Sequence, residues 1–181
     1  MNRCAWLNIR NPLYVKYHDE EWGVPQHDDT KLLELLILEG FQAGLSWECV
    51  LNKREAFLKA YDDFNLTKIL HYDDAKIQEL LSDPNIIRNK LKIVASIDNA
   101  RIFQKIKNEF GSFDAYIWGF TNNNVIIEPY NLRTTSPLSD AISKDLKKRG
   151  MKFVGSTIIY SYLQAIGILN AHGEECDFSK K

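Results

Sequence analysis

The 181-residue sequence predicts an all-α protein, because apolar residues recur at helical spacing along most of the chain. Two further observations agree. Helix-capping residues precede these segments, and glycine or proline follows them. The one strand-like run, Val125 to Ile127, is too short to build a sheet. With 45% hydrophobic residues, a chain of this length can bury a substantial core, so we expect one domain over residues 1–181.

The most apolar segment begins at Leu32 and predicts a buried central helix. Apolar side chains fill nearly every position from Leu32 to Leu38, and only Glu34 interrupts them. A helix that is apolar all round is typically buried. Candidate caps precede it, namely Asp28, Asp29 and Thr30, and Gly40 and Gly44 can end or bend it.

A carboxylate, Glu39, stands in this apolar run. Removing a carboxylate from water costs several kcal/mol unless it gains a partner. Two interpretations therefore remain open from position alone. Glu39 either reaches solvent or an arginine at the helix end, or it faces a pocket that receives a ligand with donors or a positive charge.

The other helices of the body follow from the same signals. Ser46 can cap a second helix that continues to Tyr61, and Asp73 begins a short one that ends before Pro84. A longer helix is expected from Leu91 to Phe110, where Gly111 stops it, and residues 113–120 add a turn or two. Residues 121–137 are expected to form an extended loop, so the helical body covers residues 28–120.

Residues 1–27 predict an irregular aromatic arm. Pro12, Gly23 and Pro25 interrupt it, and two tryptophans and two tyrosines lie within it. Terminal arms of this kind are poorly ordered unless the fold ties them down.

The end of the chain predicts two helices joined by a tight turn, over residues 139–168. The first covers Ser139 to Arg149, and the second begins at Ser156 after a turn bounded by Gly150 and Gly155. This is the layout of a helix–hairpin–helix DNA-binding element, in which backbone N–H groups and the helix dipole favour a phosphate. Basic residues surround the turn, including Lys147, Lys148, Arg149 and Lys152. The alternative is an ordinary packing corner with a solvated charged face.

Composition excludes several classes of protein. The formal net charge is −1, so no global field attracts the chain to nucleic acid or to a membrane. The N-terminal segment lacks the apolar region of a signal peptide, and no apolar run approaches the length of a membrane span. Three cysteines argue against a disulfide framework. We expect a soluble, cytoplasmic protein that does not bind membranes.

Two Cys–His pairs at opposite ends of the chain form a candidate zinc set, namely Cys4, His18, His172 and Cys176. Two thiolates and two imidazoles can hold one Zn²⁺ tetrahedrally, and four protein ligands make such a site structural. The ion would tie the arm to the C-terminal segment, residues 169–181. The alternative is coincidence, since the spacing of Cys4 and His18 is not that of a compact zinc finger.

Several long motifs resemble the 3-methyladenine DNA glycosylase I family. They are R-C-x-W from Arg3, P-L-Y from Pro12, Y-H-D-x-E-W-G-V-P from Tyr17, L-E-G-F-Q-A-G-L-S-W from Leu38, K-K-R-G-M-K-F-V-G-S-T from Lys147, and the pair His172 and Cys176. The similarity runs in order along essentially the whole chain.

This resemblance implies a helix–hairpin–helix glycosylase fold with one structural Zn²⁺ on Cys4, His18, His172 and Cys176. It implies a base pocket in which Glu39 is the catalytic residue and the base contacts are Tyr14, Tyr17, Trp47, Trp6 and Trp22. Such an enzyme extrudes a base from the duplex and holds it by stacking and hydrogen bonds. The expected DNA contacts are Lys152, Gly155, Ser156 and Arg149.

The expected reaction is hydrolysis of the N-glycosidic bond of 3-methyladenine in double-stranded alkylated DNA. A monomer would release free 3-methyladenine and leave an abasic site. Helix–hairpin–helix glycosylases commonly carry a catalytic aspartate shortly after the second helix, but here Asn170-Ala171-His172 occupies that region. No lysine lies within the aromatic motifs, so we expect no Schiff-base step and hence a monofunctional enzyme.

Three alternatives remain. A non-enzymatic, zinc-stabilised DNA-binding module would explain the hairpin and the Cys–His set, but not the carboxylate beside aromatic residues. A zinc-dependent hydrolase would need an open coordination position. A glycosylase for a different N3-alkylpurine would use the same residues.

Overall fold

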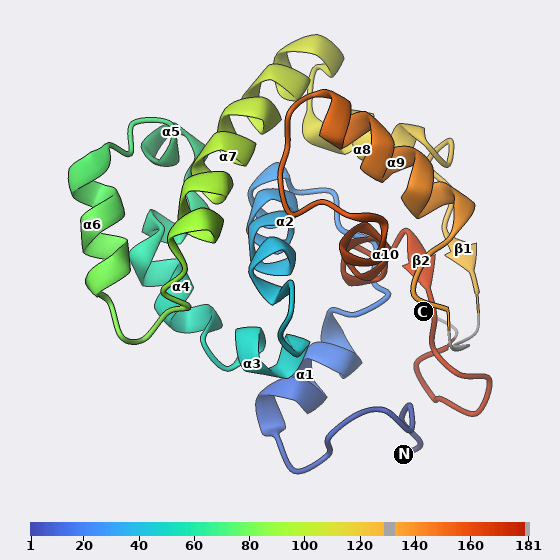
Figure 1. Ribbon diagram of the computed structural model, residues 1–181. Coiled ribbons are helices and arrows are strands. Elements are labelled where there is room, and N and C mark those ends of the chain that lie inside the picture. Colours follow the sequence, from blue (N-terminus) through green and yellow to red (C-terminus); the bar gives the residue numbers. More distant parts are fainter. Residues whose placement is uncertain (129–132, 180–181) are drawn as a thin grey trace.

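The computed structural model describes residues 1–128 and 133–179, and the described chain is predominantly helical, as predicted (Figure 1). The α-helices are α1 (Pro12–Glu20), α2 (Asp29–Gln42), α3 (Trp47–Leu51), α4 (Arg54–Ala60), α5 (Leu66–Ile69), α6 (Asp74–Ser82), α7 (Lys90–Phe110), α8 (Phe113–Gly119), α9 (Pro137–Lys148) and α10 (Ser156–Ala165). A 3-10 turn, η1 (Asp62–Phe64), lies between α4 and α5. Within the described ranges, no helix is both long and apolar enough to cross a membrane.

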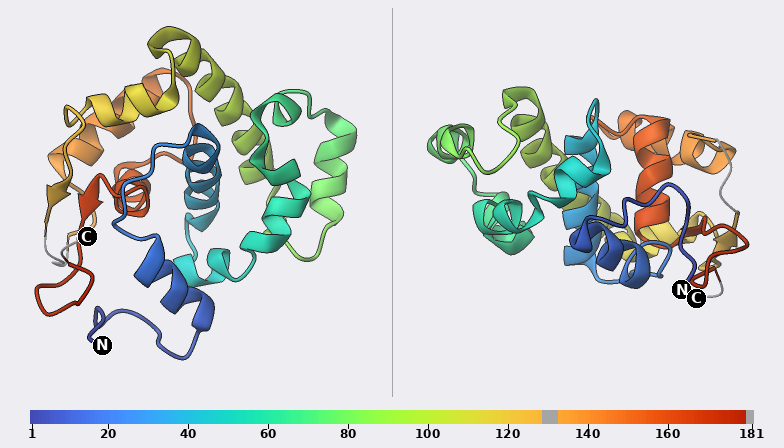
Figure 2. Two further views of the ribbon diagram at one scale, coloured as in Figure 1. Left: turned by 180° about the vertical axis from the view of Figure 1, so that it is seen from behind. Right: turned by 90° about the horizontal axis from the view of Figure 1, so that it is seen from below.

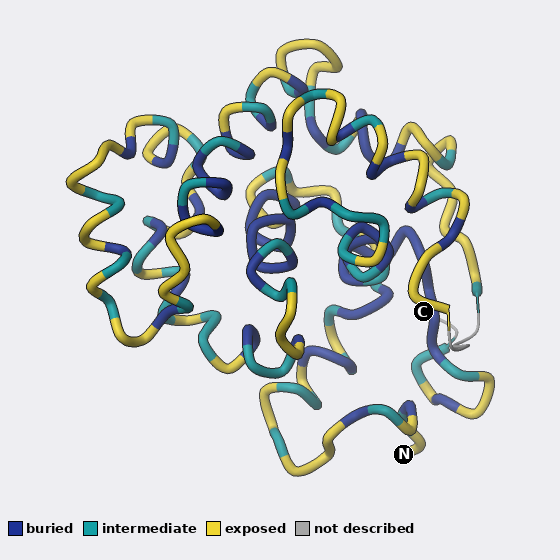
Figure 3. The backbone as a smooth tube through the Cα atoms, in the orientation of Figure 1, coloured by how far each residue is buried: buried dark blue, intermediate teal, exposed yellow. Residues whose placement is uncertain are grey.

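Helix α2 forms the centre of the molecule, as its composition predicts. Asp28 caps it by accepting a hydrogen bond from the backbone of Lys31, at 2.9 Å. Residues Leu32 to Leu38 are all buried, and the helix contacts α3, α7, α8 and α10 (Figure 3). Gly40 does not end the helix, which continues to Gln42; Gly44 follows with φ +78°. Figure 2 shows α2 between α4–α7 on one side and α8–α10 on the other.

The expectation that residues 1–27 are irregular is wrong between Pro12 and Glu20, where α1 forms. Asn11 caps this helix through its side chain, and Pro12 occupies the first turn. Proline at that position has a fixed φ that suits a helix and lacks only an N–H that would be unpaired anyway. Pro12 therefore begins a helix and does not interrupt the segment.

Helix boundaries differ elsewhere for similar local reasons. The helix expected from Ser46 to Tyr61 is divided into α3 and α4 by a turn at Asn52 and Lys53, and η1 and α5 were not predicted. Helix α9 begins earlier than expected, because Ser136 and Ser139 form a reciprocal capping box around Pro137.

The strand-like run makes one short pairing. Ile126–Ile127 (β1) lies parallel to Leu169–Asn170 (β2), so the run predicted to be too short to build a sheet forms a pairing of two residues. The backbone N–H of Glu128 continues the ladder by donating to Asn170 O, at 3.0 Å. The predicted loop of residues 121–137 includes residues 129–132, which lie outside the described residues.

The segment after α1 packs against the end of α10. Gly23 N donates to Gln164 O at 2.9 Å, and Gln26 N donates to Ile166 O at 3.0 Å. Gly167 allows this contact, since a Cβ there would lie 2.2 Å from the carbonyl carbon of Val24 and its φ is +75°. The aromatic arm therefore lies directly beside α10.

A buried ion pair joins α2 to the surrounding helices. The Glu34 carboxylate, 2% exposed, accepts from Arg54 Nε at 2.6 Å and from Lys31 Nζ at 2.8 Å. Arg54 also bonds Glu21 at 2.7 Å, just after α1. The only polar residue within the apolar run Leu32–Leu38 is therefore fully paired.

We predict that Arg54→Met destabilises the fold by about 3–5 kcal/mol, because it leaves the Glu34 carboxylate buried without its main partner. Urea unfolding at pH 7 measures this. Lys16→Met is the matched control, since Lys16 belongs to an exposed pair with Glu20 at 4.0 Å and should cost under about 1 kcal/mol. Equal losses in the two variants would contradict the role given to the buried pair.

Candidate active site

A cavity of about 210 Å³ opens where α1, α2, α3 and α10 meet. This is below the range of about 300–1,000 Å³ that is usual for drug-sized ligands, so the cavity suits a group the size of one nucleobase. All six residues predicted to bind or act on a base line it, namely Glu39, Tyr14, Tyr17, Trp47, Trp6 and Trp22. Residues that lie far apart in the sequence thus meet at one place.

Glu39 faces this cavity, and no hydrogen bond or ion pair joins it to an arginine among the described residues. Glu39 is 2% exposed, and its Oε2 has no hydrogen-bond partner among the described residues. Burial raises the pKa of the Glu39 carboxyl well above its usual range. Arg54, the nearby arginine of α4, is occupied by Glu34 and Glu21. Of the two interpretations left open by the sequence, the geometry favours the pocket.

Aromatic rings form most of the wall around this carboxyl. The ring centre of Tyr17 lies 5.3 Å from that of Trp47 and 6.4 Å from that of Tyr14. The ring centres of Trp6 and Trp22 are 4.8 Å apart. Burial, followed by the charge of Glu39, raises the pKa of Tyr17 well above its usual range. The Tyr17 phenol therefore stays neutral, and the rings present electron-rich faces that attract a desolvated cation.

Three further polar atoms of cavity residues are buried without a hydrogen-bond partner in the described part of the chain. They are Oε1 of Gln42, Nε1 of Trp47 and Nε1 of Trp6. Together with Glu39 Oε2 they offer two acceptors and two donors. Unpaired buried polar groups cost about 1–3 kcal/mol each, so this arrangement favours a ligand with complementary donors and acceptors.

The sequence interpretation missed one wall of the cavity, which α10 supplies. Its lining residues are Thr157, Tyr160, Ser161 and Gln164, joined by Arg133 and Thr134 from the preceding segment. The four α10 positions follow the spacing i, i+3, i+4, i+7, which places them on one helical face. A polar stripe in an otherwise apolar helix was the available signal. Gln42 lies one turn after Glu39. It was not predicted, because no comparable stripe of polar residues marks that part of α2.

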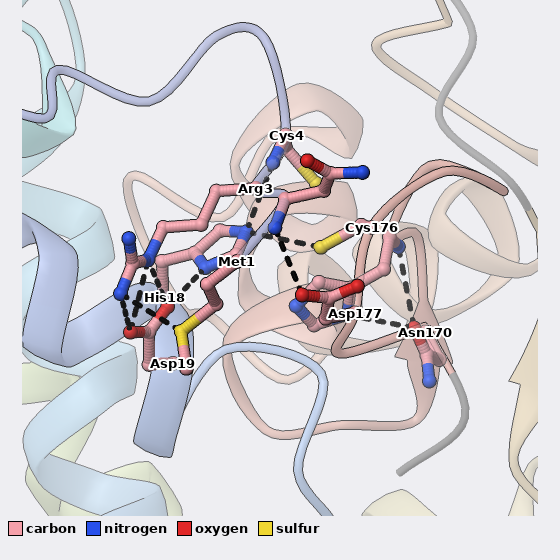
Figure 4. A network of polar contacts seen from close by, with 10 residues as sticks. Met1, Arg3, Cys4, His18, Asp19, Asn170, Cys176 and Asp177 are labelled. Carbon is pink, nitrogen blue, oxygen red and sulfur yellow. Dashed lines mark hydrogen bonds and ion pairs between the residues drawn. The ribbon is translucent and has the colours of Figure 1, made fainter.

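A second cluster of reactive side chains lies behind the aromatic wall. The ligand atoms of Cys4, His18 and Cys176 lie within 4.8 Å of one another, and all three residues are buried (Figure 4). Sγ of Cys176 is 3.7 Å from Nε2 of His18. A thiolate and an imidazole on one tetrahedral Zn²⁺ are about 3.6 Å apart, so this spacing fits a shared ion. Burial raises the pKa of the Cys4 thiol to about 11.

Neighbouring groups orient both histidines that were predicted to bind zinc. His18 Nδ1 lies 2.8 Å from Asp19, which Arg3 holds at 2.7 Å (Figure 4). His172 is not among the three clustered residues, but its ring lies 4.9 Å from that of His18, and its Nδ1 is 2.9 Å from Asn170. Hydrogen bonds to the second ring nitrogen are typical of metal-binding histidines.

The cluster and the cavity share two walls. The ring centre of Trp22 lies 4.6 Å from that of His172 and 6.0 Å from that of His18, and the ring centre of Trp6 lies 5.5 Å from that of His18. Both tryptophans also line the cavity. Whatever holds the Cys–His cluster together therefore also positions part of the aromatic wall.

The predicted DNA contacts lie on and around the turn between α9 and α10. Lys152 is exposed, and its backbone exchanges two hydrogen bonds with the Asn99 side chain, at 2.8 and 2.9 Å. Gly155 precedes α10, and the Ser156 hydroxyl bonds Asp140. Arg149, at the end of α9, pairs with Glu109 at 2.6 Å and with Asp145 at 2.7 Å.

Comparison with known proteins agrees with this geometry. Residues 6–180 match the family model described as "Methyladenine glycosylase". The chain belongs to this family. Over 180 residues it is 42% identical to DNA-3-methyladenine glycosylase 1 of Escherichia coli K12, covering 97% of this chain and 96% of the relative.

Solved structures of methyladenine glycosylases share the fold. A 3-methyladenine DNA glycosylase I from Staphylococcus aureus, whose structure concerns 3-methyladenine recognition, superposes with a TM-score of 0.94 at 35% identity, covering 100% of this chain and 98% of that one. A Tyr-to-Phe variant of such an enzyme, in complex with 3-methyladenine, gives a TM-score of 0.94 at 34% identity, covering 100% and 99%.

In this glycosylase-family site the raised pKa of Glu39 has a consequence for stability. The folded chain holds the Glu39 proton to a higher pH than the unfolded chain, where a glutamate ionises near 4.5. Glu39 therefore costs no stability below that pH and an increasing amount above it. We predict that Glu39→Gln and wild type melt alike near pH 4, and that the variant becomes the more stable as pH rises towards 8.

Melting temperatures across that pH range measure this difference. Glu55→Gln is the control, because Glu55 is exposed on α4 and its replacement should give no such pH-dependent gain. A gap between Glu39→Gln and wild type that does not change with pH would contradict the burial of an unpaired carboxyl.

Proposed function

We propose that this chain is a monofunctional DNA glycosylase of base excision repair. It hydrolyses the N-glycosidic bond of 3-methyladenine in double-stranded alkylated DNA, acts as a monomer, and leaves an abasic site. The observation that carries this proposal is the Glu39 carboxyl, buried without a partner in a base-sized cavity of aromatic rings. The names of its relatives in the methyladenine glycosylase family support the same substrate.

The cavity suits a cationic adenine better than a neutral one. Methylation at N3 of adenine in DNA makes the base cationic, and a cation favours ionised Glu39, which releases its proton on binding. Each aromatic face adds about 0.5–2 kcal/mol for a desolvated cation. The exocyclic amine can donate to the unpaired acceptors of Glu39 or Gln42, and a ring nitrogen can accept from Trp47 Nε1. Neutral adenine offers the same edge without the charge.

The same carboxylate can favour the reaction itself. When the bond between the base and C1′ breaks, its electron pair moves to the base, which leaves neutral. Positive charge then develops on the deoxyribose, until a water oxygen bonds to C1′ and a proton is lost. A carboxylate fixed in the low-dielectric cavity stabilises the charge before and after this transfer. No lysine lines the cavity among the described residues, which fits hydrolysis without a Schiff base.

Helices α9 and α10 would grip the DNA as a helix–hairpin–helix element. Lys152 supplies an exposed charge, and the first turn of α10, after Gly155, has no side-chain cap on its N–H groups. Phe153 lies against Gly40, where an added Cβ would be 3.7 Å from Phe153 Cβ. The hairpin thus touches α2 one residue beyond Glu39. Arg149, already paired twice, would brace the turn more than it would bind a phosphate.

One Zn²⁺ would hold the Cys–His cluster together. Cys4, His18 and Cys176 offer three ligands, and His172, oriented through Nδ1 by Asn170, would supply the fourth through Nε2. The ion would lower the pKa of both thiols and act as a structural link between the ends of the chain. It would take no part in the chemistry, because none of Cys4, His18, His172 and Cys176 is among the described residues that line the cavity.

The reaction is tested by incubating methylated duplex DNA with the protein and identifying released purines by chromatography. We expect free 3-methyladenine, and abasic strands that break only after treatment with alkali. Strand breakage by the protein alone would contradict the monofunctional assignment. Absence of any released base, from folded protein that binds DNA, would favour a zinc-stabilised DNA-binding module.

We predict that wild type contains one zinc per chain, and that Cys4→Ser loses it and melts several degrees lower, because the arm is no longer tied down. Metal analysis and thermal melting measure both properties. Cys49→Ser is the control, since Cys49 is half-buried in α3 and outside the cluster. Zinc-free wild type that melts like Cys4→Ser would count against a structural ion.

A further inference from the structure

The cavity has a deep part and an exposed rim. Glu39 and Tyr17 are 2% and 3% exposed and lie inside, whereas Thr134, Thr157 and Arg133 are exposed. The Arg133 side chain is 64% exposed. A base that enters to reach Glu39 leaves its deoxyribose and phosphate at the rim. The exposed rim residues are therefore the ones placed to meet the sugar–phosphate backbone.

Among the described residues, the cavity is lined by one acidic side chain, Glu39 inside, and one basic side chain, Arg133 at the rim. A guanidinium near the mouth opposes the entry of a cationic base on its own. It favours entry only if an anion arrives with the base and stays beside the arginine. A nucleotide brings such an anion, because its phosphate remains attached until after the base is released.

Arg133 is held in place by the short strand pair. Arg133 Nη1 donates to Glu128 Oε1 at 2.9 Å, and the Glu128 side chain is 19% exposed. The Glu128 backbone is fixed by its hydrogen bond to Asn170 O at 3.0 Å, next to β1 and β2. The guanidinium presents five N–H donors in a planar fork, and this geometry suits bidentate contact with a phosphate.

We propose that Arg133 binds the phosphate of the extruded nucleotide at the rim of the cavity while the base lies beside Glu39. This inference rests on the proposed glycosylase function. Thr157 connects the two DNA-contacting regions, because it lines the cavity and also lies in the first turn of α10, directly after the hairpin. The phosphate on Arg133 and the phosphate gripped by the hairpin would thus belong to one continuous stretch of strand.

The test compares wild type, Arg133→Gln and Arg133→Lys on duplex DNA that contains 3-methyladenine. We expect Arg133→Gln to raise KM about tenfold. It should also reduce the magnitude of the slope of log(kcat/KM) against log[salt] by about 1, which corresponds to the loss of one phosphate contact. Arg133→Lys keeps the charge, so it should keep the slope while recovering only part of the KM. Inhibition by free 3-methyladenine, which carries no phosphate, should change by less than about twofold in both variants.

Arg101→Gln is the matched control. Arg101 is also exposed and pairs with Asp98 at 2.8 Å. It lies on roughly the opposite side of α7 from Asn99, the residue that holds the hairpin, because two residues along an α-helix are about 200° apart around its axis. Its loss should leave the KM and the salt slope unchanged.

Several outcomes would overturn the inference. An Arg133→Gln variant with wild-type KM and salt slope would refute it while the glycosylase function stands. Weaker inhibition by free 3-methyladenine, or a lower melting temperature, would mean that Arg133 shapes the cavity and does not bind phosphate. If wild type releases no 3-methyladenine, the proposed function fails, and this inference fails with it.

Discussion

A carboxyl buried without a partner is the constraint on which the rest of this structure depends. Glu39 lies on the helix that packs against four others, and nothing in the described chain neutralises it. Its neighbour on the same helix, Glu34, shows the usual solution, since Arg54 and Lys31 pair with it. The fold thus pairs Glu34 with basic side chains and leaves Glu39 unpaired, so that a ligand can interact with it. Such a site lowers stability in the empty protein and becomes favourable when a cation binds.

The surrounding architecture serves to build a cavity over that carboxyl. No single segment supplies it: α1 and the arm bring the tyrosines and two tryptophans, α3 brings Trp47, and α10 closes the remaining side. The arm stays in place through backbone bonds to the end of α10 and through the cluster of Cys4, His18 and Cys176. Because Trp6 and Trp22 touch both the cluster and the cavity, the joining of the chain ends also shapes the substrate site.

Residues with strong chemical signals were predictable from the sequence. The apolar run of α2 and its carboxyl, the aromatic arm, the Cys–His pairs and the glycine-bounded turn could all be found there. The misses have physical causes. Helix α1 was obscured by a proline that begins a helix as well as interrupting one, and β1 pairs over only two residues. The α10 wall and Arg133 were missed because hydroxyls, an amide and a single arginine look like surface residues until the fold turns them towards Glu39.

The account is tested most directly by the single-turnover rate of base excision from methylated duplex by wild type and Glu39→Gln, at protein concentrations that saturate the DNA. If the unpaired carboxyl selects and stabilises the cation, the variant should excise 3-methyladenine at least about 100-fold more slowly, although it folds and binds the DNA as well as wild type. An unchanged rate would contradict this account, because recognition would then rest on the aromatic rings and Glu39 would be a stability cost without a function.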